Sequence, residues 1–145
     1  MLQQIRYDCD LSLWLEETIA QLKRGDLQNI DIEHLVEELE GLAGRDKREL
    51  KSRLQTLLYH ILKRIYVNLP NEFNGWQRTI REQRKELRLL LETSPSLKSI
   101  LLESFDPIYQ KALKDIREDY GSVTFPEIWP YDRDLETILS KNFWD

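Results

Sequence analysis

Two histidines and one cysteine are the residues of this chain best suited to nucleophilic or acid–base chemistry near neutral pH. His60 falls on the polar side of a helix that hydrophobic spacing predicts over 46–67, and the helix expected before it is rich in glutamate. Carboxylate partners would raise the pKa of His60 and fix the orientation of its ring. We expect either a structural hydrogen bond of His60 at the helix surface or a polar cluster that could form an enzyme pocket, comprising Glu37, Glu40, His60 and Gln83.

The second histidine has a spacing that occurs at metal sites. His34 follows Asp31 by three residues, and an imidazole and a carboxylate one turn apart can share a metal ion in helical bundles. A di-metal bundle needs this spacing twice, but Leu57 stands where the second carboxylate would precede His60. Helical phasing also turns His34 away from the apolar side, so we expect it to face solvent, with no metal and no cofactor.

The lone cysteine, Cys9, lies near a helix start but is flanked by Asp8 and Asp10, whose charges oppose a reactive thiolate. A single cysteine also excludes an intrachain disulfide and a multi-cysteine metal site. The sequence contains no glycine-rich phosphate loop, dinucleotide fingerprint or zinc-finger spacing. None of the common catalytic motifs therefore names a substrate.

Charge is sorted by sign along the chain. The net charge is −7 over residues 1–44, +7 over 45–88 and −5 over 89–145. Amphipathic helices alone do not require this order. It indicates that the central segment meets an acidic partner, which could be the flanking helices, a second subunit or a phosphate backbone.

The helix expected over 76–92 carries part of this basic charge. Phasing at about 100° per residue places four cations in one row and Gln83 within the apolar stripe opposite, where an unpaired amide would cost roughly 1–3 kcal/mol. We expect Gln83 to make an interhelical hydrogen bond or to face a ligand. A solvated face, an acidic protein surface or a nucleic acid could each explain the cations, but the net charge of −5 disfavours nucleic acid. The candidates for this basic face are Arg45, Lys47, Arg48, Arg53, Arg78, Arg81, Lys85 and Arg88.

The elements that would position these residues are almost all helices. We predict an all-α fold, a single-domain bundle of five to six helices over residues 1–145, with the helix over 46–67 at its centre because its apolar arc covers about half of its circumference. Gly41, Gly44 and a capping-box pattern at Asp46 favour a break at 41–46, since an unbroken helix would imply an elongated molecule or a dimer.

Further along the chain, Pro70 should end the central helix, and Pro107 should kink or divide a later one. Residues 123–131 should form an ordered aromatic loop on the core, and Asp132 should cap a short last helix.

The composition sets the broad class. A hydrophobic content of 41% in 145 residues supports a folded core, and no apolar run is long enough to span a membrane. The first ten residues lack the pattern of a secretory signal. We expect a soluble cytoplasmic protein, more plausibly a non-enzymatic helical interaction protein able to self-associate than a nucleic-acid-associated protein or an enzyme.

Several segments, in order, carry a resemblance to a known family over essentially the whole chain. They are Tyr7-Asp-Cys-Asp-Leu-Ser-Leu-Trp14, Leu35-Val-Glu-Glu-Leu-Glu-Gly-Leu42, Asp46-Lys-Arg-Glu-Leu50, Leu57-Leu-Tyr-His-Ile-Leu-Lys63, Trp76-Gln-Arg-Thr-Ile-Arg-Glu-Gln-Arg84, Ser94-Pro-Ser-Leu97 and Phe125-Pro-Glu-Ile-Trp-Pro-Tyr131. With these segments the chain resembles the bacterial family catalogued as domain-of-unknown-function family 29, common in photosynthetic bacteria. The resemblance implies an all-α fold and no assigned activity. This chain departs from the family at Trp129, where a cysteine is usual, and at Pro107, where proline is not.

Overall fold

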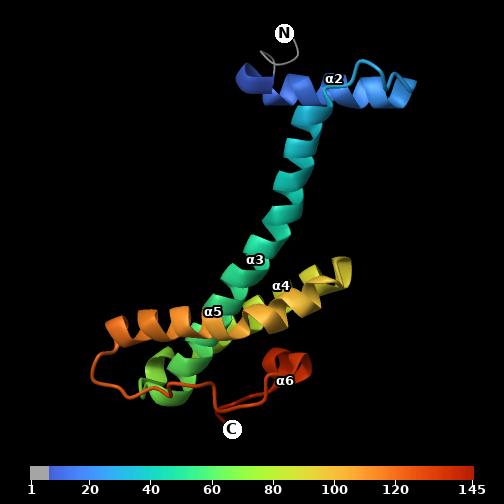
Figure 1. Ribbon diagram of the computed structural model, residues 1–145. Coiled ribbons are helices and arrows are strands. Elements are labelled where there is room, and N and C mark those ends of the chain that lie inside the picture. The colour runs from blue at the N-terminus through green and yellow to red at the C-terminus, as the bar shows by residue number, and fades with distance from the viewer. Residues whose placement is uncertain (1–6) are drawn as a thin grey trace. The chain divides into compact units, whose positions relative to one another are not determined.

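The computed structural model describes residues 7–145, which are helical for the most part and contain no strand (Figure 1). The predicted all-α class is confirmed. The chain divides after Gly44 into two compact units, here called the N-terminal and C-terminal units. The expectation of one domain over 1–145 stays a prediction, and the argument against a secretory signal rests partly on residues 1–6, which lie outside the described residues.

The N-terminal unit consists of helix α2, Leu11–Arg24, and the start of helix α3. Asp10 caps α2 by accepting a hydrogen bond from the Leu13 N–H at 3.1 Å. Gly25 ends the helix in the left-handed conformation, at φ 73°, which glycine adopts without a steric penalty. Asp31 accepts from the His34 N–H at 3.3 Å and so caps α3.

Helix α3 runs without interruption from Ile32 to Tyr66, and the boundary between the two units falls within it. The predicted break at 41–46 is therefore wrong. Each glycine costs only about 1 kcal/mol relative to alanine in a helix interior, and no proline interrupts the segment. The apolar stripe also continues in phase from Leu39 to Leu50, so continuing the helix outweighs a restart at Asp46.

The C-terminal unit is built around the second part of α3, as predicted. Helices α4, Phe73–Thr93, and α5, Leu97–Asp119, pack on it, and a short 3-10 turn, Pro70–Glu72, follows the end of α3. Both later helices bury regularly spaced apolar residues in the same core. The α3 side chains that are completely buried are Leu50, Leu54, Leu57, Leu58, Ile61 and Leu62.

Helix α5 continues through Pro107, so of the two predicted effects, a kink or a division, the division is wrong. A proline removes one backbone N–H donor and leaves the carbonyl four residues earlier without its helical partner. Here both Pro107 and Glu103 lie on the exposed side, where water can bind that carbonyl. Phe105 and Ile108 are buried beside the proline and hold the helix on the core.

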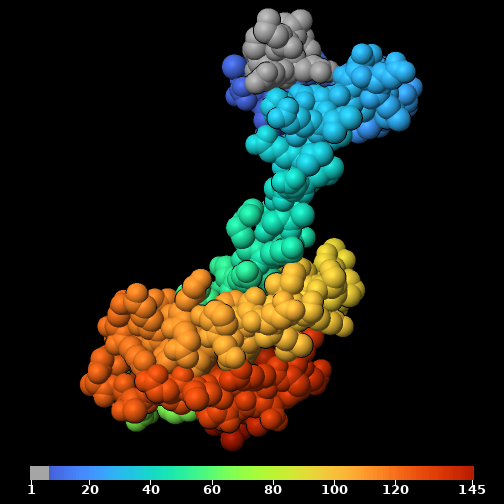
Figure 2. Space-filling model, in the orientation of Figure 1, coloured from blue at the N-terminus to red at the C-terminus, as the bar shows by residue number. Residues whose placement is uncertain are grey.

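The segment after α5 lies on the core, as predicted for residues 123–131. Figure 2 shows the C-terminal residues (red) packed along α5 (orange). Trp129 is buried, and its ring meets Phe105 and Tyr109 edge-on, with 5.6 Å between ring centroids in both pairs. The Tyr109 hydroxyl donates to the Pro126 carbonyl at 2.6 Å. These contacts fix the loop without regular secondary structure.

The last helix, α6, Leu135–Ser140, begins two residues later than predicted. Its cap is Asp134 rather than Asp132, because the Asp134 carboxylate accepts from the Thr137 N–H at 3.0 Å. Within residues 7–145, none of the helices has both the length and the apolar character needed to cross a bilayer.

Candidate functional site

The N-terminal unit exposes an unusual share of apolar side chains. Of the thirteen large hydrophobic side chains that are exposed among the described residues, nine lie between Leu11 and Leu42. Four of these follow one face of α3 and are here called the α3 stripe: Ile32 (64% exposed), Val36 (44%), Leu39 (56%) and Leu42 (52%). Contiguous exposed apolar surface on a small protein is typical of an interaction site.

The opposite side of this part of α3 is occupied by an aromatic cluster. The Tyr7 ring stacks on His34 with 4.0 Å between centroids and meets Trp14 edge-on at 5.0 Å. The Tyr7 hydroxyl donates to the Glu38 carboxylate at 2.8 Å. Since His34 lies about 200° around the helix from Ile32, α2 packs against α3 without using the face that carries the stripe.

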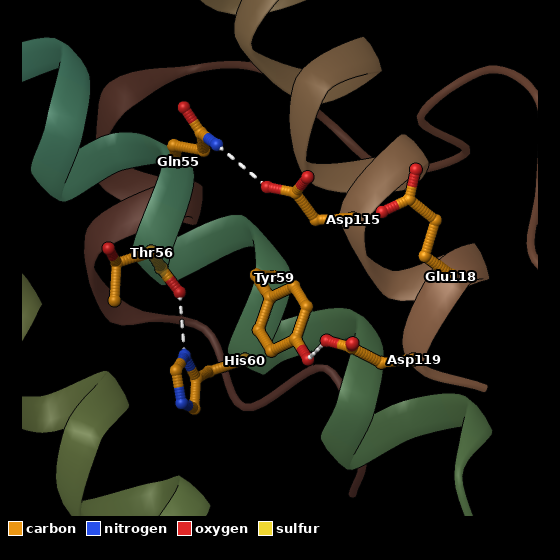
Figure 3. Close-up of a pocket in the computed structure, with 7 residues that line it drawn as sticks. All are labelled: Gln55, Thr56, Tyr59, His60, Asp115, Glu118 and Asp119. Atoms are coloured by element: carbon orange, nitrogen blue, oxygen red, sulfur yellow. Dashed lines mark hydrogen bonds between the residues drawn. The ribbon is translucent and has the colours of Figure 1, made fainter.

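A second feature is a hollow of about 330 Å³ between α3 and α5, lined by His60 (Figure 3). Gln55 Nε2 donates to Asp115 Oδ2 at 3.1 Å, and the Tyr59 hydroxyl donates to Asp119. Figure 3 shows the His60 ring on the other side of Tyr59 from these α5 carboxylates, turned toward Thr56. Its Nδ1 lies 2.8 Å from the Thr56 carbonyl oxygen and must donate, because a carbonyl only accepts.

The surroundings of His60 and Tyr59 favour the neutral forms of these two side chains. Burial lowers the pKa of His60, and the nearby Lys63 charge acts in the same direction. Burial raises the pKa of Tyr59, and its hydrogen bond to Asp119 adds to the effect. His60 is thus a neutral imidazole near pH 7, held by a backbone carbonyl instead of by a carboxylate. The arrangement at Nδ1 is a structural hydrogen bond to the backbone.

The four residues of the predicted polar cluster are not brought together around His60. The hollow at His60 takes its carboxylates from α5, whereas Glu37 and Glu40 belong to the N-terminal unit. Glu37 and Glu40 precede His60 by 23 and 20 residues in the same uninterrupted helix. Gln83 lines a different, smaller hollow, where its Oε1 accepts from Arg53 at 3.2 Å in an interhelical hydrogen bond.

The basic-face candidates on α3 divide into two kinds. Arg53 is held within the C-terminal unit, with its Nε 2.9 Å from Glu49 and a terminal nitrogen 3.9 Å from Glu86 of α4. Among residues 7–145, Arg45 has an ion pair with its neighbour Asp46, with 4.0 Å between Nε and the carboxylate. The exposed candidates on this helix are Arg45, Lys47 and Arg48.

On α4 the predicted row of cations is largely exposed, at Arg78, Arg81 and Lys85. Its fourth member has a structural partner: a terminal nitrogen of Arg88 donates to the Leu139 carbonyl and, at 2.9 Å, to the hydroxyl of Ser140. Arg88 therefore binds the C-terminal end of α6, where a cation also complements the helix dipole.

Comparison with known proteins identifies the family of this chain. The family model described as "Domain of unknown function DUF29" matches residues 6–144. The chain belongs to the DUF29 family. No curated protein and no solved structure matches it significantly, so family membership brings no activity with it.

Two residues of this DUF29 chain have roles that the sequence did not reveal. Arg84 is 6% exposed, and it donates to the carbonyls of Ile138 at 3.0 Å and Lys141 at 2.6 Å. Burial, with a smaller contribution from the charge of Arg88, lowers the pKa of Arg84 to about 10, so it stays protonated at neutral pH. The available signal was its position about 80° from Trp76, between the apolar stripe and the cations of α4.

His34 is the other residue. Its predicted exposure to solvent is wrong, because its side chain is 16% exposed and its Nδ1 lies 2.6 Å from Asp31 Oδ2. The hydrogen bond to Asp31 raises the pKa of His34, and the Asp31 charge supports it. Its burial depends on the packing of α2 and Tyr7, which periodicity within α3 alone does not show.

Proposed function

We propose that this DUF29 protein is a non-enzymatic helical interaction protein whose N-terminal unit binds a protein partner. The observation that carries the proposal is the concentration of nine exposed large hydrophobic side chains between Leu11 and Leu42. The hollow beside His60 has a lining whose arrangement names no substrate, so the proposal rests on the apolar face.

Covering the α3 stripe with a partner would be energetically favourable. Fully burying an aliphatic side chain contributes roughly 1.5–3 kcal/mol, so covering the four half-exposed residues of the α3 stripe would contribute roughly 3–6 kcal/mol before association entropy is subtracted. An amphipathic helix with an open apolar face most often binds another helix or a groove.

Site-specific photo-crosslinking in the cells that naturally make the protein tests the proposal. A photo-reactive amino acid at Leu39 should give an adduct of discrete mass on irradiation, and the adduct should disappear when Val36→Glu is added. Leu102, 50% exposed on α5, is the matched control and should give none. The proposal is contradicted if Leu39 gives no adduct, or if both positions give the same one.

A further inference from the structure

The α3 stripe is bordered by acidic residues on both sides. By helical phasing, Glu33 and Glu40 lie about 100° and 80° from Ile32 on one side, and Glu38 lies about 120° away on the other. No lysine or arginine occurs between Gly25 and Gly44. The face is thus an apolar seam between acidic margins.

This arrangement specifies the chemistry of the occupant. Building on the proposed function, we infer that the α3 stripe binds an amphipathic helix of another protein, with an apolar seam flanked by lysine or arginine. Leucine-type side chains of such a helix would cover Val36 and Leu39, and its cations would lie against Glu33 and Glu40. Complementary charge at the margins of an interface favours the correct partner and accelerates association.

A second copy of this chain fits the same face less well. The antiparallel pairing that best superposes the two stripes, with Ile32 opposite Ala43 of the second copy, places Glu33 on the same side of the seam as Glu40 of that copy. The two carboxylates are then about two residues, or roughly 3 Å, apart along the helix axis. A parallel pairing brings Glu40 of one copy to the side of the seam that carries Glu38 of the other, about two residues away along the axis. Like charges at facing positions destabilise helix pairs, so both arrangements oppose the apolar contact.

The test uses the full-length protein and three synthetic, fluorescently labelled peptides. Two peptides share a leucine seam at helical spacing and carry either lysine or glutamate on both flanks. The third keeps the lysines but replaces the leucines by serine. By fluorescence anisotropy, we expect the lysine-flanked seam to bind at least about tenfold more tightly than the glutamate-flanked one at low salt, with the ratio shrinking as salt rises. The serine peptide should not bind.

Variants of the protein locate the binding. Val36→Glu/Leu39→Glu should abolish binding of the lysine-flanked peptide, although it adds negative charge that would strengthen a purely electrostatic contact. Glu33→Gln/Glu40→Gln should reduce the affinity ratio between the lysine-flanked and the glutamate-flanked peptide by a factor of about ten or less. The lysine-flanked peptide should still bind through its leucine seam. Leu102→Glu adds one charge on α5 and should change neither result. All changed side chains are exposed, and matching far-UV circular dichroism spectra would show that the fold is kept.

Two outcomes would overturn the inference. One is equal affinity for the lysine- and glutamate-flanked peptides, and the other is peptide binding that survives Val36→Glu/Leu39→Glu. If sedimentation equilibrium instead finds a dimer of the unmodified protein that the same double substitution dissociates, the occupant is a second copy. In that case the inference fails while the proposed function stands, whereas loss of the Leu39 crosslink in cells would remove the proposed function itself.

Discussion

The two histidines of this chain are shifted in opposite directions by their surroundings. The hydrogen bond to Asp31 raises the pKa of His34, whereas burial lowers that of His60, each from an ordinary value of 6.5. NMR titration of the two imidazole rings should therefore give a midpoint above 6.5 for His34 and below 6.5 for His60. Asp31→Asn should bring the His34 midpoint down and leave His60 unchanged. Equal midpoints for the two rings would contradict the structure.

These shifts also determine how stability depends on pH. For His34, whose folded-state pKa is raised, the contribution is fully present below the unfolded value and is lost as pH rises through the folded pKa. For His60, whose folded-state pKa is lowered, the unfolded chain binds the extra proton, so stability decreases as pH falls from about 6.5 toward the folded pKa. His60→Gln should remove this second dependence, measured as urea unfolding midpoints across that pH range.

Of the cations on α4, we expect Arg84 to stabilise the folded protein most. Arg84→Ala would leave the carbonyls of Ile138 and Lys141 without their donor, and we expect a loss of roughly 2–3 kcal/mol in the free energy of unfolding. The exposed Arg78 provides the control, since Arg78→Ala should change stability by no more than about 0.5 kcal/mol. Equal effects of the two substitutions in urea titrations would refute this role.

At the scale of the helices, two glycines should respond in opposite ways to alanine. Gly41 lies inside α3 with open space where a Cβ would stand, so Gly41→Ala should stabilise the protein by about 0.5–1 kcal/mol. Gly25 ends α2 at φ 73°, and Gly25→Ala should destabilise it by about 1 kcal/mol. Urea unfolding followed by circular dichroism measures both, and a stabilising Gly25→Ala would contradict the left-handed cap.

Local signals predicted most of the helices, and the errors have physical causes. Asp10, Gly25 and Asp31 act through residues next to them, so their caps are visible in the sequence. The continuity of α3 and the passage of α5 through Pro107 depend instead on the balance between a local penalty and packing or solvent exposure. That balance is set by neighbouring elements and is not encoded in spacing along one helix.

The candidate sites also combine local signals, which the sequence shows, with contacts between elements, which it does not. The apolar spacing of Ile32, Val36 and Leu39 is evident in the sequence, but such spacing normally indicates a buried face, and only the structure shows it exposed. The α5 carboxylates that line the hollow with His60 lie sixty residues along the chain from Gln55 and Tyr59, to which they are hydrogen-bonded. No local sequence pattern extends over that separation.

At the scale of the whole molecule, the two units differ in what they bury. Among described residues, the N-terminal unit fully encloses Trp14 and Thr18, whereas the other buried side chains belong to the C-terminal unit. An element with few buried side chains opens more readily and gains most from a partner. The sorting of charge along the sequence fits this division, because the exposed apolar face coincides with the acidic stretch.

Hydrogen–deuterium exchange of the full-length protein, with and without the lysine-flanked peptide, shows whether the peptide binds the N-terminal part of α3. We expect the peptide to slow exchange of the backbone amides in 32–43 and to leave those in 50–62 and 97–119 unchanged. Unchanged exchange in 32–43, or protection confined to the C-terminal unit, would contradict this expectation.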